Sequence, residues 1–200
     1  AEELARVSLA AVLAEARAAL ARGDRVAALA AIEPLLASEG PDPAVLSLQG
    51  EILEAQGNLT RALAAHSACV AAEPYAPGHR LRRARTLVAM GQFLAADLDV
   101  AALAPAPEAG DESVYLAARV AEALGRSTEA LRRYRALLRP GAPWTTGEPA
   151  RLADVLLRRS RVLVETESYA EAVLHLDEVL RSDPDRSEAR FLRGLALVES

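Results

Sequence analysis

The sequence predicts an all-α protein built from one repeated pair of helices. Ala, Leu, Arg and Glu, which favour helices, dominate its 200 residues, whereas aromatic residues make up 4%. Glycines recur at a constant spacing, at Gly23, Gly57, Gly91 and Gly125, and an alanine follows each of them five residues later. Because a fixed period is the sequence signature of a repeat architecture, we expect a helix–turn–helix unit to recur along the chain.

Each unit divides at its glycine into a first and a second helix. In the second unit, for example, the first helix is expected over 43–56 and the second over 59–72. Prolines separate the units, because proline lacks the N–H that continues a helix and clashes with the preceding turn. The expected repeats cover residues 9–42, 43–76, 77–110, 111–144 and 153–186, followed by a half repeat at 187–200. We expect them to form a single domain that is a fragment of a longer protein.

The fifth repeat is displaced from the regular spacing. Glu167 stands where the other copies carry glycine, but it lies further along the chain than the spacing of the four glycines predicts. The surplus lies in the Pro/Gly-rich segment 140–149, which we interpret as an inserted loop. It contains the only tryptophan, Trp144, which we expect to pack over neighbouring helices, although an exposed recognition role is the alternative.

Composition and spacing exclude several classes of function. The net charge of −5 disfavours a nucleic-acid partner, and no apolar run is long enough to span a membrane. His66 and Cys69 lie three residues apart, but no further ligand is suitably spaced, so we expect both inside a helix pair rather than on a metal. No catalytic or phosphate-binding motif occurs, and we therefore predict a non-enzymatic protein without a cofactor. All 23 basic residues are arginine, which is typical of a GC-rich bacterial genome.

The repeating unit resembles the tetratricopeptide repeat. That family has small residues at positions 8 and 20, where the two helices cross closely. Position 20 is alanine in all five complete copies, and position 8 is small in all six. At position 8 the chain carries Ala16, Gly50, Ala84, Ala118, Ser160 and Gly194. The resemblance implies a right-handed superhelical solenoid whose inner wall is formed by the first helices.

The resemblance also places candidate binding residues on that inner wall. At positions 5 and 9, the family's groove positions, the chain carries apolar side chains and a series of arginines. The predicted partner-binding residues are Leu13, Arg17, Leu81, Arg85, Tyr115, Arg119, Leu157, Arg161 and Phe191. Arginine can hold a carboxylate with two hydrogen bonds, so we expect a protein or peptide partner with acidic and apolar residues. The alternative is that these arginines reflect only the Arg-rich composition.

The resulting functional hypothesis is a non-catalytic scaffold that binds a protein or peptide segment in its groove. Two alternatives remain open at this point: an accessory repeat domain of a larger enzyme, such as a glycosyl- or sulfotransferase, and a peptide-sensing regulator. The densest basic run, residues 79–85, is interpreted as a solvated helix surface rather than as a binding patch.

Overall fold

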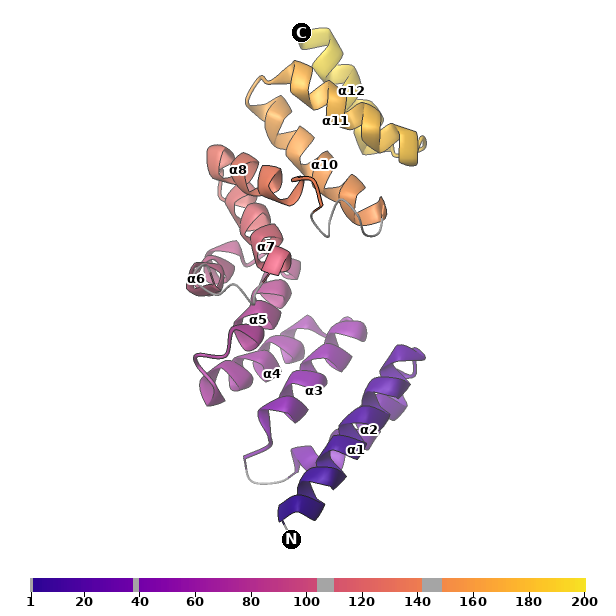
Figure 1. The fold of residues 1–200 in the computed structure, drawn as a ribbon, viewed down its shortest axis with the longest axis vertical. Coiled ribbons are helices and arrows are strands. Elements are labelled where there is room, and N and C mark those ends of the chain that lie inside the picture. Colours follow the sequence, from indigo (N-terminus) through magenta and orange to yellow (C-terminus); the bar gives the residue numbers. More distant parts are fainter. Residues whose placement is uncertain (1, 38–39, 104–109, 142–148) are drawn as a thin grey trace. The chain divides into compact units, whose positions relative to one another are not determined.

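The computed structural model describes residues 2–37, 40–103, 110–141 and 149–200, and all regular structure within them is helical (Figure 1). The all-α prediction is therefore confirmed for the described residues. Trp144 and most of the predicted inserted loop lie outside them. The chain divides into two compact units, residues 1–103 (unit 1) and 104–200 (unit 2).

Unit 1 contains three consecutive helix pairs. They are α1 (Glu2–Ala21) with α2 (Arg25–Leu36), α3 (Pro43–Ala55) with α4 (Leu59–Ala72), and α5 (Pro77–Ala89) with α6 (Phe93–Leu103). Helix α3 packs against both α1 and α2, and α5 packs against α4. Helices α3 and α5 both begin with a proline, a residue well suited to the first helical turn, and these two prolines stand at the same position of their repeats.

Unit 2 contains two helix pairs and a final single helix. The pairs are α7 (Gly110–Ala123) with α8 (Ser127–Leu137), and α10 (Pro149–Glu165) with α11 (Tyr169–Ser182). The final helix, α12 (Ser187–Glu199), packs against α10 and α11, and α10 also contacts α8.

The turn inside each pair has the same hydrogen-bonding pattern five times. A residue with positive φ ends the first helix, and the next N–H returns to a carbonyl five residues earlier, as in Asn58 N to Leu53 O at 2.9 Å. In the first four turns the residue with positive φ is a glycine, because glycine adopts positive φ without steric cost. These residues are Gly23, Gly57, Gly91 and Gly125. In the fifth copy Glu167 adopts φ 60°, the only non-glycine residue with positive φ among the described residues.

The two helices of each pair cross at small side chains. The position 20 alanines are completely buried in all five pairs: Ala28, Ala62, Ala96, Ala130 and Ala172. Opposite them, Ala16, Ala84, Ala118 and Ser160 are likewise fully buried. Gly50 takes this place in α3, where a Cβ atom would lie 2.2 Å from Cε1 of the buried His66. In the second pair the buried His66 thus occupies the space that a Cβ atom at position 50 would need.

We expect Gly50→Ala to lower the free energy of unfolding by about 1–3 kcal/mol, because the fully buried His66 has little room to yield. Gly194→Ala is the matched control at the same repeat position, where an added Cβ meets nothing within 4 Å. It should be neutral or stabilising by up to about 1 kcal/mol, since alanine favours a helix over glycine. Urea unfolding measures both. Equal effects of the two substitutions would contradict the close approach at Gly50.

Relief of the backbone at Glu167 should stabilise the fifth turn. Because a non-glycine residue at positive φ costs about 1–2 kcal/mol, Glu167→Gly is expected to raise the free energy of unfolding by up to about 1 kcal/mol. Gly57→Ala, at the equivalent turn, should have the opposite sign. Thermal denaturation of both variants tests this, and destabilisation by Glu167→Gly would refute it.

Candidate functional site

Four of the predicted binding residues lie on the first helices of unit 1. Arg17 is exposed, and Leu81 and Arg85 are half-buried. Leu13 is only 6% exposed and belongs to the core that includes Ile32. Its predicted position on an open wall is not observed. Helices α2 and α3 both pack against α1 and cover the side of α1 that carries Leu13.

A polar cavity of about 280 Å³ adjoins Arg17. It is lined by side chains of α1, α3 and α5, including Arg17, Ser47 and Arg82, and by His79 at the start of α5. These helices are the first members of three successive pairs. First helices therefore contribute most of the lining, and we call this the first-helix cavity.

Most of the charges around the first-helix cavity are compensated within the protein. The Arg82 Nε donates to Glu51 at 2.8 Å, and the ring nitrogen Nε2 of His79 lies 2.8 Å from Glu73 Oε2. Arg17 has no ion-pair or hydrogen-bond partner for its side chain among the described residues, so its guanidinium is available to a ligand. Sequence reasoning did not select His79 and Arg82, because repeat register identifies a residue's helix but not how far a long side chain reaches.

The basic run at residues 79–85 is more than a solvated surface. Arg83 donates two hydrogen bonds to Asp99, at 2.7 and 2.6 Å, and Arg80 adds a third at 3.3 Å. Asp99 lies on α6 and is 1% exposed. A buried carboxylate requires such partners, since its desolvation is otherwise costly. The hydrogen bonds to Asp99 in turn raise the pKa of Arg83. The earlier interpretation of this run was therefore wrong for Arg80 and Arg83, which hold α5 to α6.

In unit 2 the predicted residues range from buried to exposed. Leu157 is 2% exposed, because α8, α11 and α12 all pack against its helix. Tyr115 donates a hydrogen bond to Asp154, and the Arg119 guanidinium lies 5.8 Å from the centre of the Tyr115 ring, within range of a cation–π interaction. Phe191 on α12 is 69% exposed. Of these residues, Phe191 is the most accessible to a partner.

Arg161 is held by carboxylates of its own chain. It donates to Glu122 at 2.9 Å and also to Glu188. Glu122 additionally accepts a hydrogen bond from the Tyr134 hydroxyl at 2.5 Å and faces Arg158 at 3.8 Å. Burial, reinforced by the charge of Glu122, raises the pKa of Tyr134, which remains a hydrogen-bond donor. A ligand carboxylate must therefore displace an internal one to reach Arg161.

The buried pair His66 and Cys69 supports packing rather than chemistry. Both are completely buried, as expected, and the Cys69 thiol donates to the Pro43 carbonyl at 3.4 Å. Burial raises the pKa of this thiol to about 11, so it is protonated and unreactive at neutral pH. The described part of the chain holds no cluster of three metal-ligating side chains. Nor does it contain a helix long and apolar enough to cross a membrane.

The sequence and the fold were each compared with those of known proteins. A family model described as "Tetratricopeptide repeat" matches residues 13–77 and 157–200, together more than half of the chain. No curated protein matches the sequence. Three solved structures illustrate the fold.

The first is that of YrrB, described as a tetratricopeptide-repeat protein with an unusual peptide-binding site. It has 16% identity and a TM-score of 0.73, covering 92% of this chain and 90% of that one. MamA from Desulfovibrio magneticus RS-1 has 17% identity and a TM-score of 0.72, over 90% and 97%. A thermophilic repeat protein from Thermus thermophilus, TTC0263, has 18% identity and a TM-score of 0.59, over 94% and 97%. At such low identity these likenesses show a shared fold.

Stability should depend on pH through His175. Burial, followed by the positive charge of Arg159, lowers the pKa of His175, although Glu171 and Glu178 oppose this. His175 therefore binds a proton more readily in the unfolded chain than in the folded one. The free energy of unfolding is therefore at its full value above about pH 6.5. It decreases as the pH falls below about 6.5, with a slope of at most about 1.4 kcal/mol per pH unit.

We therefore expect the free energy of unfolding of the wild type to fall between pH 7.5 and 5.5, and His175→Gln to flatten this dependence. Urea titrations at both pH values measure it. If His175→Gln keeps the full slope, the pH dependence has another origin.

Proposed function

Because the chain belongs to the tetratricopeptide-repeat family, we propose that it is a non-catalytic scaffold that binds a protein or peptide segment along its first helices. The observation that carries the proposal is the exposed Arg17 guanidinium beside the first-helix cavity. Packing within the chain does not require this arrangement, whereas a guanidinium at the mouth of a polar cavity can receive a carboxylate in two hydrogen bonds. The peptide-binding site reported for the structurally similar YrrB supports the same class of ligand.

The partner segment is proposed to combine acidic and apolar residues. In unit 1, Arg17 receives a carboxylate directly, while Arg82 can exchange Glu51 for a ligand carboxylate. The half-buried Leu81 and Arg85 belong to the same helix as Arg82 and extend the contact. Such an exchange releases the partly exposed Glu51 carboxylate to solvent and adds specificity for an acidic residue.

Unit 2 offers a second surface of the same character. It consists of Tyr115 and Arg119, stacked on one another, together with Arg161 and the exposed Phe191. Arg161 is proposed to exchange Glu188, which is itself partly exposed, for a ligand carboxylate, and Phe191 to contact an apolar residue. Leu13 and Leu157, which are buried, are not part of either surface.

The proposal is tested with fluorescein-labelled peptides that alternate Glu and Leu, with Gln–Leu and Lys–Leu peptides as controls. We expect the Glu–Leu peptide to bind most tightly in fluorescence anisotropy titrations of the full chain. Arg17→Ala should weaken its binding about tenfold, since hydrogen bonds between charged groups contribute about 1.5–3 kcal/mol. Arg22→Ala, which removes an exposed arginine just beyond the same helix and outside the cavity, should leave binding unchanged.

A second arm separates the two units. Arg161→Ala, checked for folding by circular dichroism, should weaken binding if unit 2 contributes. Loss in both Arg17→Ala and Arg161→Ala would mean that both surfaces contribute to binding. Equal binding of the Glu–Leu and Lys–Leu peptides, or wild-type affinity in both variants, would refute the proposal.

A further inference from the structure

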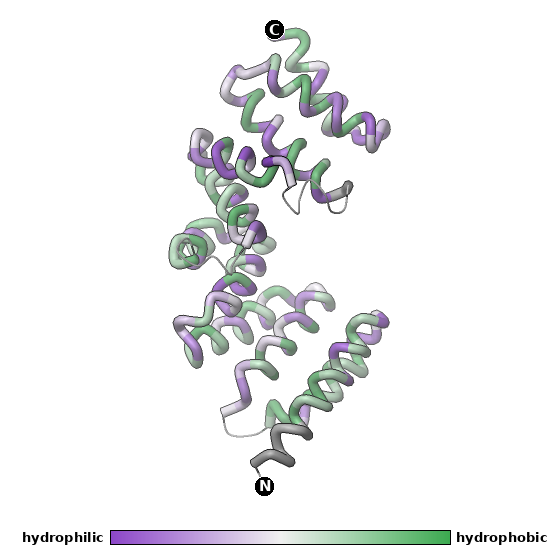
Figure 2. The backbone as a smooth tube through the Cα atoms, in the orientation of Figure 1, coloured by the Kyte–Doolittle hydropathy of each residue, from purple (hydrophilic) through white to green (hydrophobic). Residues whose placement is uncertain are grey.

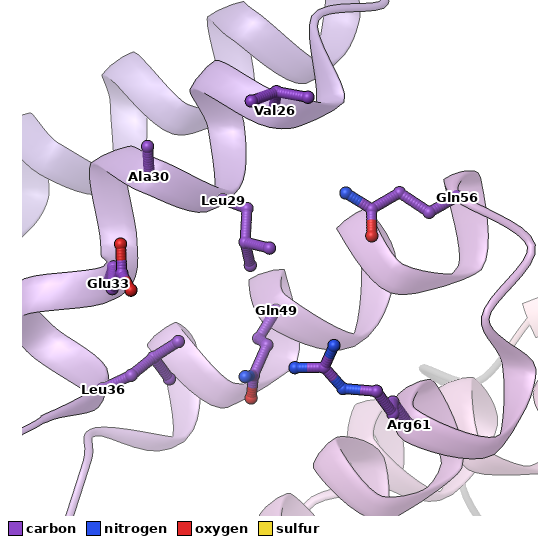
Figure 3. A pocket seen from close by; sticks show the side chains of 8 residues that line it. All are labelled: Val26, Leu29, Ala30, Glu33, Leu36, Gln49, Gln56 and Arg61. Carbon is purple, nitrogen blue, oxygen red and sulfur yellow. The ribbon is translucent and has the colours of Figure 1, made fainter.

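A second cavity lies in unit 1, lined by the second helices α2 and α4 together with α3. Its volume is about 310 Å³, at the lower end of the range for ligand pockets and enough for one or two side chains. Figure 3 shows its apolar side, where Val26, Leu29 and Leu36 of α2 lie opposite the polar side chains of α3 and α4. We call this the α2–α4 pocket. It shares no lining residue with the first-helix cavity.

Helix α2 is apolar around most of its circumference although only one side of it is buried. Of its twelve residues only Arg25 and Glu33 are charged, and Figure 2 shows the α1–α2 pair coloured as hydrophobic along most of its length. Ala28 and Ile32 are its buried residues, while Val26 is 78% exposed and Leu29 and Leu36 remain partly accessible in the pocket. A helix that is apolar all round is normally covered on all sides, so this face is suited to a partner.

Two opposite charges flank the apolar surface. Glu33 and Arg61 lie on opposite sides of Leu29 (Figure 3), and neither side chain forms an ion pair with another described residue. The charges therefore do not neutralise each other inside the pocket. They remain available to a ligand that carries a positive group on one side and a negative group on the other.

The remaining wall can bind a peptide backbone. Gln49 lies on α3 and Gln56 at its C-cap, two helical turns further along, and both point toward the pocket (Figure 3). Each amide can donate and accept hydrogen bonds, as the backbone of an extended peptide requires. Gln56 makes only a long hydrogen bond to the Arg25 carbonyl, at 3.5 Å, which a ligand can replace readily.

We propose that the α2–α4 pocket binds a peptide segment of a partner protein in which one apolar side chain lies between a basic and an acidic residue. The apolar side chain contacts Val26, Leu29 and Leu36. The basic residue pairs with Glu33 and the acidic residue with Arg61, while Gln49 and Gln56 bond to the peptide backbone. This site is additional to the first-helix surface and does not depend on it.

Three short peptides with blocked ends test the charge arrangement: Lys-Gly-Leu-Gly-Glu, Lys-Gly-Leu-Gly-Lys and Glu-Gly-Leu-Gly-Glu. Because a peptide can bind in either direction, the proposal distinguishes mixed from like charges rather than one order from the other. In NMR titrations of the full chain, the mixed peptide should bind the wild type about fivefold more tightly than either like-charge peptide. It should shift the signals of Val26, Leu29 and Leu36.

Single charge reversals should redirect this preference. Glu33→Arg leaves two positive flanks and should prefer the Glu/Glu peptide, whereas Arg61→Glu leaves two negative flanks and should prefer the Lys/Lys peptide. Glu199→Arg and Arg132→Glu make the same changes in net charge at exposed residues of unit 2 and should keep the mixed-peptide preference. Replacing the peptide's leucine by serine should weaken binding at least about tenfold, because it removes the buried apolar contact.

Three results would overturn the proposal. The first is no binding at the highest peptide concentration that remains soluble. The second is binding whose order of preference is the same in wild type, Glu33→Arg and Arg61→Glu. The third is a set of shifted signals confined to the first-helix cavity. Since Arg17→Ala lies outside the α2–α4 pocket, it should leave mixed-peptide binding intact, which distinguishes this site from the proposed functional surface.

Discussion

The close crossing of the two helices in each pair is the constraint on which the rest of the structure depends. Five alanines with no exposed surface stand at these crossings, one per pair. A small side chain lets the helix axes approach, and the larger residues on either side then interlock. The crossing recurs once in each repeat, and it directs the remaining side chains either toward a neighbouring pair or outward. In the second pair Gly50 stands at the crossing, and the buried His66 fills the space beside it.

Arginine and carboxylate pairs form a second level of organisation between helices. Asp99 is the clearest case, since a buried carboxylate on α6 binds two arginines of α5. Glu122 has a comparable role in unit 2, where it meets Tyr134 and Arg161 from two other helices. The chain's many arginines are thus divided between structural ion pairs and surface positions. A partner that approaches the first helices competes with the internal carboxylates, which favours a ligand whose acidic groups arrive together.

The two cavities of unit 1 differ in chemistry because different residues line them, although helix α3 contributes to both. The first-helix cavity is lined largely by polar and charged residues of both signs, including Arg17, and is proposed to receive an acidic segment. The α2–α4 pocket has an apolar wall with one charge of each sign at its flanks. Two such surfaces on one scaffold would let it hold two different segments at once, and the proposed experiments address them through separate residues.

The sequence by itself determined the helix pairs, their turns and the small residues at their crossings. These are local or strictly periodic features: a glycine is needed where φ is positive, and an alanine where two helices meet. It also identified Arg17 as an exposed residue of a first helix. Only the tertiary structure decided that Leu13 and Leu157 are core residues, that Arg83 holds Asp99, and that α2 borders a pocket. The physical reason is that these outcomes depend on contacts between helices. Periodicity assigns a residue to a helix face, but the neighbouring helix decides whether that face is covered and which charge a long side chain reaches.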